Sequence, residues 1–240
     1  MPTAVRAPII RVMHTSTDGA LPLLRLMHLV SPGLPVGGFT YSQGIEWAVE
    51  TGWIRDADDL ERWMADQIGS SLRYLDIPLL VRMQAAALDR DQAALAGWVD
   101  RLLAGRETAE LRREESDRGR ALADLLVAWG LEDALGWKPQ LARSQAAGFA
   151  FAAASWRIEP SEAATGYAWS WLENLVLAGI KLVPLGQTRG QQTLARLATL
   201  IPSTVAVALG VADEEIGAST PALAIASSAH ETQYTRLFRS

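Results

Sequence analysis

Two adjacent residues near the end of the chain have the types that metal chemistry uses. His230 and Glu231 begin the run H-E-T-Q-Y, which matches the metalloprotease pattern H-E-x-x-H up to its fifth position. That position holds Tyr234 instead of the second histidine, and two imidazoles one helical turn apart are what bind the zinc ion. The other histidines, His14 and His28, stand alone in the sequence. A metal-dependent hydrolase using His230 and Glu231 is therefore only an alternative hypothesis, and we expect no metal site.

Motifs for nucleotide binding and nucleophilic catalysis are absent from the sequence. It contains no Gly-Lys-Ser or Gly-Lys-Thr of a P-loop, no G-x-G-x-x-G and no G-x-S-x-G. The carboxylate pairs Glu114–Glu115 and Glu214–Glu215 have solvated surroundings in the sequence, so neither resembles a tuned general acid. We therefore predict a protein that is not an enzyme and binds no cofactor of its own.

A loop rich in glycine and proline is the first candidate binding segment. Residues Ser31–Glu46 (SPGLPVGGFTYSQGIE) contain two prolines and four glycines between helical stretches. Two interpretations remain equal here. The loop presents Phe39 and Tyr41 to a partner, or it is an ordinary connection with both aromatics turned inward.

The C-terminus is the second candidate, because chain ends are seldom this apolar. HETQYTRLFRS combines Tyr234, Leu237 and Phe238 with Arg236 and Arg239, a composition suited to a partner's groove. The alternative is a tail folded back on its own core. A weaker third candidate runs from Lys181 to Gln187, where Lys181 either stabilises a helix end or lies at an exposed contact.

The segments between these candidates have apolar residues at helical spacing, which predicts helices that hold the candidates in place. One apolar face repeats every three or four residues through Leu60, Trp63, Met64, Ile68, Leu72 and Leu75. Asp58 and Glu61 could form a capping box before it. A second face contains Leu122, Leu125, Leu126 and Trp129, and it follows a charged stretch, Arg112–Arg120. We interpret that stretch as a solvated helix face with i,i+4 pairs, the alternative being a charged docking surface.

Proline and glycine positions set the remaining boundaries. Pro160 suits a first helical position, and that helix should end near Lys181–Pro184. Another helix spans about 187–200, with a break at Pro202. Thr220–Pro221 should cap and open a last helix that reaches about Arg236. Alternation typical of strands is almost absent, so the prediction is an all-α, single-domain helical bundle over 21–240 after a mobile leader at 1–20.

Composition narrows the class of partner. The 240 residues are 49% hydrophobic with a formal net charge of -5, so a core can form and nucleic acid is not the expected ligand. The chain has no cysteine, which is typical of a reducing compartment. No signal peptide and no apolar run of about 20 residues is visible, so we expect a cytoplasmic protein without a membrane partner.

Three blocks of the sequence resemble the urease accessory protein UreF family. SPGLPVGGFTYSQGIEWAVETGW fits the pattern L-P-[VI]-G-x-[FY]-[ST]-x-S-x-G-[LI]-E from Leu34 to Glu46. ENLVLAGIKLVPLGQTRGQ (Glu173–Gln191) and HETQYTRLFRS are similar to two further family blocks. The resemblance runs in order from about Leu21 to Ser240. One departure is Ala229, where family members often have arginine before the H-E-T-Q-Y run. It puts one charged contact near the tail in doubt.

The resemblance implies an all-α homodimer that takes part in urease maturation through nickel insertion. It implies an adaptor that joins a UreD-type protein (UreH in some organisms) to the GTPase UreG on the urease apoprotein, with nickel delivery and GTP use left to the partners. Carried over by motif, the partner surface would include Pro35, Gly37, Phe39, Ser42, Gly44 and Glu46. The contact near UreG would include Lys181, Pro184, Gly186 and Gln187. The tail for the UreD-type protein would include His230, Glu231, Tyr234, Arg236, Phe238 and Arg239.

A third hypothesis is direct regulation of UreG. Arg236 or Arg239 could supply an arginine to the bound nucleotide and change GTP turnover. The sequence gives no reason to prefer this function over simple docking.

Overall fold

The most buried element is the alanine-rich helix α8 (Gln145–Ser155), in which every residue from Gln145 to Ala154 is buried. Helices that are apolar on all sides belong in the interior of a protein. Its small side chains let α4 (Ile77–Leu88) and α6 (Ala109–Ala128) pack closely against it. At Gly148 a Cβ would lie 2.9 Å from the Leu122 side chain, so that glycine permits the close approach of α6.

The computed structural model describes residues 17–240, and no strand occurs within that range, as predicted. One apolar core joins residues from Leu29 to Ile216. The remaining α-helices, listed with their bounds, are α1 (Thr17–Leu29), α2 (Ile45–Glu50), α3 (Ala57–Gln67), α5 (Gln92–Ala104), α7 (Ala134–Leu141), α9 (Pro160–Leu182), α10 (Gly186–Ala198), α11 (Ile201–Ala208) and α12 (Pro221–His230). Short 3-10 turns occur at η1 (Gly38–Thr40) and η3 (Asp213–Glu215).

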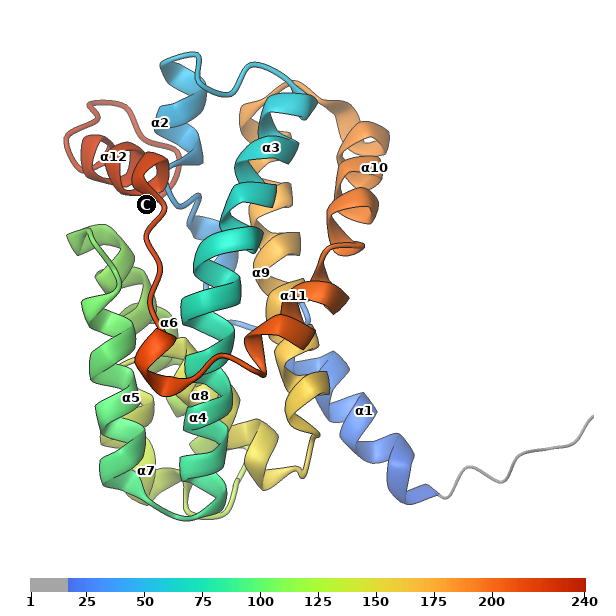
Figure 1. Cartoon of the computed structure of the whole chain (residues 1–240), viewed down its shortest axis with the longest axis vertical. Helices are drawn as coiled ribbons and strands as arrows, with labels where there is room; N and C mark the ends of the chain where they lie inside the picture. Colours follow the sequence, from blue (N-terminus) through green and yellow to red (C-terminus); the bar gives the residue numbers. More distant parts are fainter. Residues whose placement is uncertain (1–16) are drawn as a thin grey trace, which may run out of the picture.

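Residues 57–88 form one central rod of α3, a π-helix η2 (Ile68–Asp76) and α4 (Figure 1). The predicted apolar face lies along it: Leu60, Met64, Ile68, Leu72 and Leu75 are buried, and Trp63 is half-buried. The predicted cap is wrong. Asp56 is the N-cap, and its Oδ1 accepts the N–H groups of Asp58 (3.0 Å) and Asp59 (2.9 Å). An aspartate directly before the first turn needs no second residue to act as a cap.

Pro78 explains a long-range contact of the rod. Proline has no N–H to donate to the carbonyl four residues earlier, which is that of Tyr74. The N–H of Gly217, in the segment before α12, donates to this oxygen at 2.9 Å. The C-terminal part of the chain thus completes the backbone hydrogen bonding where the π-helix lies.

Boundaries set by proline are largely confirmed. Helix α9 begins at Pro160, and Pro202 lies at the start of α11 after the end of α10. The last helix does begin at Pro221, but the Thr220 hydroxyl bonds Ser70 and Ser71 instead of capping it. It also ends at His230, six residues before the predicted end at Arg236. Turns follow it, in which the N–H of Thr232 donates to the Ala229 carbonyl (3.2 Å) and that of Gln233 to the His230 carbonyl (3.1 Å).

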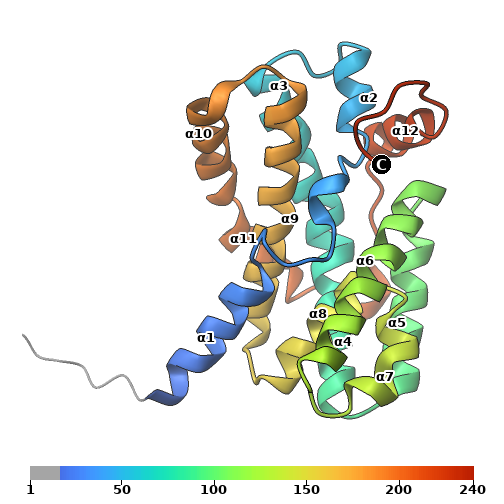
Figure 2. The same cartoon turned by 180° about the vertical axis from the view of Figure 1, so that it is seen from behind.

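The two ends of the molecule differ in what they carry. Helices α2 and α12 and the C-terminus lie at one end, and α7 lies at the other (Figures 1 and 2). Helix α1 extends from the body beside α9. Residues 1–16 of the expected leader, with His14, lie outside the described residues, and α1 already begins at Thr17.

Candidate functional site

The three candidate segments meet at the end that carries α2 and α12. The N–H of Arg239 donates to the Thr40 carbonyl (2.8 Å), so the tail (residues 231–240) lies beside the glycine–proline loop (residues 31–46). Ser42 donates to the Ser240 carbonyl twice, from its N–H (2.7 Å) and its Oγ (2.6 Å). The Lys181 Nζ lies 5.8 Å from the centre of the Phe238 ring. Segments far apart in sequence therefore form one continuous region.

Glu46, in the first turn of α2, fixes the tail from inside. The N–H of Leu237 donates to its Oε1 (2.6 Å), and that of Phe238 donates to its Oε2 (2.9 Å). Only 7% of Glu46 is exposed. Hydrogen bonds to a buried carboxylate are short and strong, and each removes an unsatisfied backbone donor. Glu46 therefore holds the tail against α2 at residues 237–238, several residues after α12 has ended.

His230 lies between two carboxylates. Its Nδ1 is 2.7 Å from Glu110 Oε2 on α6, and its Nε2 is 3.2 Å from Glu46 Oε2. The ring is fully buried. Arg236 Nη1 binds the second oxygen of Glu110 at 2.7 Å. We call Glu46, Glu110 and His230 the Glu46 cluster; it joins α2, α6 and α12 and holds the tail on them.

Gly44 allows α2 and α12 to come close enough for these contacts. Its φ is 79°, in the left-handed region that favours glycine. A Cβ there would lie 3.0 Å from both the Ala226 Cβ and the Ser227 nitrogen of α12. Both the turn and the approach of the two helices therefore depend on glycine.

The charged stretch Arg112–Arg120 is not wholly a solvated face, which corrects the prediction. Glu114, Glu115 and Arg118 are buried. Glu114 accepts from Arg118 Nη1 (2.8 Å), Gln43 Nε2 (3.1 Å) and Ser240 Oγ (3.3 Å). This side of α6 faces the loop and the tail, so its charges are satisfied by protein groups instead of water. Glu214 and Glu215 are exposed, as predicted.

A second buried ionic cluster lies farther along the same helix. Arg106 bonds both Asp76 and Glu115, the latter at 2.7 Å, and Ser144 Oγ donates to Glu115 (2.9 Å). Burial raises the pKa of Asp76 against the attraction of Arg106. For Glu115 burial acts in the same direction, but Arg106 and the Ser144 hydroxyl outweigh it and lower the pKa. The environment thus pushes the two carboxyl pKa values apart.

The predicted site residues divide into outward and inward groups. Those on the surface, fully or in part, are Pro35, Gly37, Phe39, Lys181, Pro184, Gly186, Gln187, Glu231, Tyr234, Arg236 and Arg239. Those buried inside this chain are Ser42, Gly44, Glu46, His230 and Phe238. The buried group cannot contact a partner in this conformation, and its members instead shape the loop and the tail.

In both the loop and the tail, some of the aromatic and apolar side chains are exposed and others are buried. Phe39 is 59% exposed, whereas Tyr41 is buried and its hydroxyl donates to Asp117 Oδ2 (3.3 Å). In the tail, Phe238 is buried, whereas Leu237 is 68% exposed and Tyr234 is fully exposed. The loop is anchored by Tyr41 and exposes Phe39, and the tail is anchored by Phe238 and exposes Tyr234 and Leu237.

Sequence reasoning missed Glu110, which binds both His230 and Arg236. It also missed that Glu231 Oε1 accepts the N–H groups of Ala109 (2.9 Å) and Glu110 (3.2 Å) at the start of α6. The sequence does contain a pattern that indicates the buried charges of α6. Extending the apolar face of Leu122 and Leu126 backward by helical steps reaches Arg118, Glu115 and Leu111.

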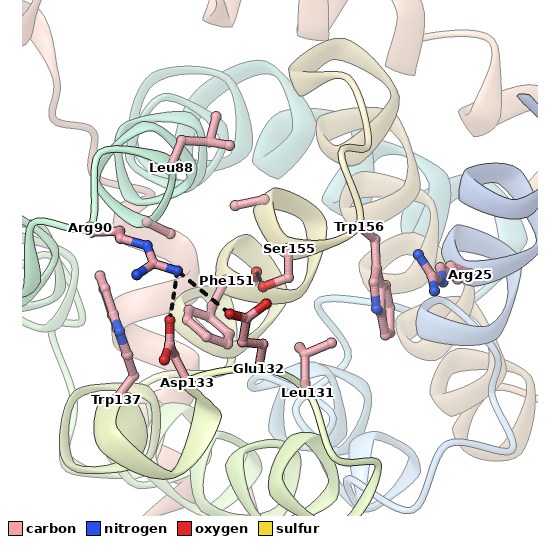
Figure 3. A pocket seen from close by; sticks show the side chains of 12 residues that line it. Arg25, Leu88, Arg90, Leu131, Glu132, Asp133, Trp137, Phe151, Ser155 and Trp156 are labelled. Carbon is pink, nitrogen blue, oxygen red and sulfur yellow. Dashed lines mark hydrogen bonds and ion pairs between the residues drawn. The ribbon is translucent and has the colours of Figure 1, made fainter. Parts of the chain in front are cut away.

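The opposite end of the molecule carries an open groove of about 340 Å³. Figure 3 shows its apolar floor of Phe151 with Trp137 and Trp156 on either side, and the ion pairs of Arg90 with Glu132 and Asp133 at its rim. We call it the tryptophan groove. None of the predicted site residues lines it.

Among the residues that the structure describes, no group of three His, Cys, Asp or Glu could hold a metal ion. No helix in this range is long and apolar enough to span a bilayer.

The comparisons with known proteins all point to the same family. The model of the UreF family matches residues 54–198. A urease accessory protein UreF of Pseudomonas putida is 53% identical over 220 residues, which covers 92% of this chain and 98% of the relative. The UreF of Alcanivorax borkumensis is 49% identical over 222 residues, covering 90% and 97%. That of Citrobacter koseri is 46% identical over 217 residues, with the same coverage.

Proposed function

The chain belongs to the UreF family of urease accessory proteins, and from this premise we propose that it is a non-catalytic adaptor in urease maturation. It joins a UreD-type accessory protein (UreH in some organisms) to the GTPase UreG on the urease apoprotein. Nickel delivery and GTP hydrolysis belong to the partners. The cytoplasmic location remains a prediction from the sequence.

The observation that carries the proposal is the pair of exposed side chains on an internally fixed tail. Tyr234 and Leu237 point to solvent while the backbone of residues 237–238 is bound by Glu46. Aromatic and arginine side chains dominate binding energy at protein interfaces, and a rigid segment loses little entropy on binding. Phe39 on the adjoining loop and Arg239 extend this surface. We propose it as the contact for the UreD-type partner.

The exposed residues Lys181, Pro184, Gly186 and Gln187 supply the proposed contact near UreG. Lys181 lies in the last turn of α9, Pro184 in the connection that follows, and Gly186, with a left-handed φ of 68°, begins α10 together with Gln187. The cation–π contact of Lys181 with Phe238 joins this patch to the tail. One region of the chain could therefore contact two partners at once.

Point substitutions of exposed residues test the tail contact without removing internal contacts. In Tyr234→Ala/Leu237→Ala we expect affinity for the UreD-type partner to fall more than about tenfold, because each side chain is a candidate anchor. Leu135→Ala is the matched control, since Leu135 is 71% exposed on α7 at the opposite end. Isothermal titration with the purified partner measures both. Unchanged affinity of the double variant would remove the tail from the interface.

Both alternative functions need side chains that already form hydrogen bonds or other contacts within this chain. An arginine supplied to the nucleotide of UreG requires Arg236 to leave Glu110, or Arg239 to act from beside Thr40. For a hydrolase, His230 is bound on both nitrogens and Glu231 binds the start of α6. GTP turnover of UreG with Arg236→Ala and Arg239→Ala separates regulation from docking. A loss of turnover with unchanged complex formation would favour the regulator.

We also propose that the protein is a homodimer, as the family resemblance implies. The support is helix α1, whose exposed face carries Leu21, Leu24 and Met27. Contiguous apolar surface of this kind is typical of an interface. Light scattering should give a dimer mass for the wild type and a smaller mass for Leu24→Asp/Met27→Asp. A monomer for the wild type would refute the dimer.

A further inference from the structure

An open pocket of about 510 Å³ lies beside the tail and carries more arginines than carboxylates. It is lined by Tyr41, Glu110, Arg113, Asp117 and the tail residues 236–239. Three of these side chains are arginines and two are carboxylates, on a chain whose formal net charge is -5. We call it the arginine pocket. A positively charged pocket on an acidic protein favours a negatively charged group.

Both carboxylates of the pocket already have arginine partners within the chain. Glu110 accepts from Arg236 Nη1 at 2.7 Å. Asp117 binds Arg120, which lies one helical turn further along α6. The two carboxylates therefore balance the charges of Arg236 and Arg120, and not those of the other arginines that line the pocket.

Arg113 and Arg239 are the arginines left without an ionic partner. Both are exposed, and neither forms an ion pair in the part of the chain that the structure describes. Arg113 lies one helical turn before Asp117, but Asp117 pairs with Arg120 instead. Arg239 comes from the tail, where its N–H donates to the Thr40 carbonyl at 2.8 Å. Two separate segments thus each bring an unpaired guanidinium group to one pocket.

A carboxylate is the anion that fits the arginine pocket best. A guanidinium group has paired N–H donors that match the two oxygens of a carboxylate. A phosphate group matches them too, but its larger charge would be repelled more strongly by the nearby Glu110 and Asp117. Leu237, which is 68% exposed, adds apolar surface to the pocket. An acidic side chain next to an apolar one, as on a protein segment, matches this combination.

We propose that the arginine pocket receives an aspartate or glutamate side chain of the UreD-type partner, bound by Arg113 and Arg239. The inference rests on the proposed function, because it names the chemistry that the tail surface recognises. It adds to that surface a residue of α6, Arg113. The tail side of the pocket is already fixed by the hydrogen bonds to Glu46 and Thr40. Arginines held in this way are frequent hot spots of protein interfaces.

Charge reversal of Arg113 in the full-length protein tests the inference. Arg113 has no internal ion pair, so Arg113→Glu should keep the thermal unfolding midpoint of the wild type. Its affinity for the purified UreD-type partner should fall more than about tenfold, because a carboxylate at this position repels the incoming one. Arg157→Glu is the matched control. It makes the same change of charge at an exposed position after α8, away from the tail, and should bind as the wild type does. Isothermal titration measures all three proteins.

Two further variants give a readout that is specific to an ion pair. Affinity of the wild type should fall as the salt concentration rises, and this dependence should be weaker in Arg113→Ala. Arg113→Lys keeps the charge but not the paired donors, so its affinity should lie between those of the wild type and Arg113→Ala. If Arg113→Glu does not fold, Arg113→Ala decides, since it removes the ion pair without adding a charge.

Wild-type affinity in a folded Arg113→Glu protein would overturn the inference. Titration with inorganic phosphate at matched ionic strength examines the other anion. Phosphate binding that is lost in Arg113→Glu while partner affinity is unchanged would assign the pocket to a phosphate group and overturn the inference as well.

Failure of the proposed function looks different. In that case the wild-type protein does not bind the UreD-type partner at all, and the inference falls with it. Failure of the inference alone leaves wild-type binding intact and sensitive to Tyr234→Ala/Leu237→Ala, but insensitive to Arg113→Glu.

Discussion

The Glu46 cluster and the rim of the tryptophan groove both join charged residues from separate segments, yet they differ in solvation. His230 is fully buried, and the side chains of Glu46 and Glu110 are each only 9% exposed. At the groove, Arg90 binds Asp133 at 3.0 Å, but their side chains are 71% and 46% exposed. Water screens exposed ion pairs, whereas a buried charge left without its partner is strongly destabilising. Burial therefore decides which of these clusters holds the structure together.

The largest loss of unfolding free energy is expected for Glu46→Ala. It leaves the N–H groups of Leu237 and Phe238 and one nitrogen of His230 without their acceptor. Loss of one partner in a buried ionic cluster costs about 3–5 kcal/mol. Urea unfolding monitored by circular dichroism measures this, and trypsin should cut more readily after Arg236. Glu132→Ala at the groove is the matched control and should unfold as the wild type does. Equal midpoints for the two variants would contradict the comparison.

Two glycines, one at each end of the molecule, allow the cost of a glycine-to-alanine substitution to be compared. Gly44 and Gly130 both have positive φ, 79° and 68°, but only Gly44 lies against another helix. Gly130→Ala should cost about 1 kcal/mol for the left-handed conformation. Gly44→Ala should cost about 3 kcal/mol, because its Cβ also meets the backbone of α12. Thermal unfolding of both proteins gives the difference, and similar costs would mean that the α2–α12 contact adapts easily.

The smallest effect is expected for Arg90→Ala. Its pairs with Asp133 and Glu132 are exposed, so the free energy of unfolding should change by less than about 0.5 kcal/mol. Any change should shrink further at high salt. A loss above 1 kcal/mol that resists salt would show that the groove rim contributes more than its exposure indicates.

Much of the fold could be predicted because its helices follow local rules. The face from Leu60 to Leu75 and the start of α9 at Pro160 depend on spacing and on proline chemistry within a few residues. The end of α12 could not be predicted in this way. The path of the tail after His230 depends on Glu46, which lies 191 positions before Leu237 and binds its N–H group. No local pattern contains that information.

The candidate site was predicted in its segments but not in its division of roles. The sequence indicated the loop and the tail, yet it could not indicate that Glu46 and His230 face inward while Leu237 faces outward. Which side of an irregular segment is buried depends on the element packed against it. Glu110 escaped notice for the same reason, since its partners His230 and Arg236 lie more than 100 residues away.

The central claim is that buried residues set the geometry of an exposed interface. The most direct test is the affinity of the UreD-type partner for Glu46→Gln, measured by isothermal titration beside the wild type and Glu132→Gln. Glu46 is 7% exposed and does not reach the surface that the partner would touch. The account predicts about tenfold weaker binding for Glu46→Gln, because the amide cannot accept both tail N–H groups and the ring donor. Wild-type affinity in a folded Glu46→Gln protein would contradict it.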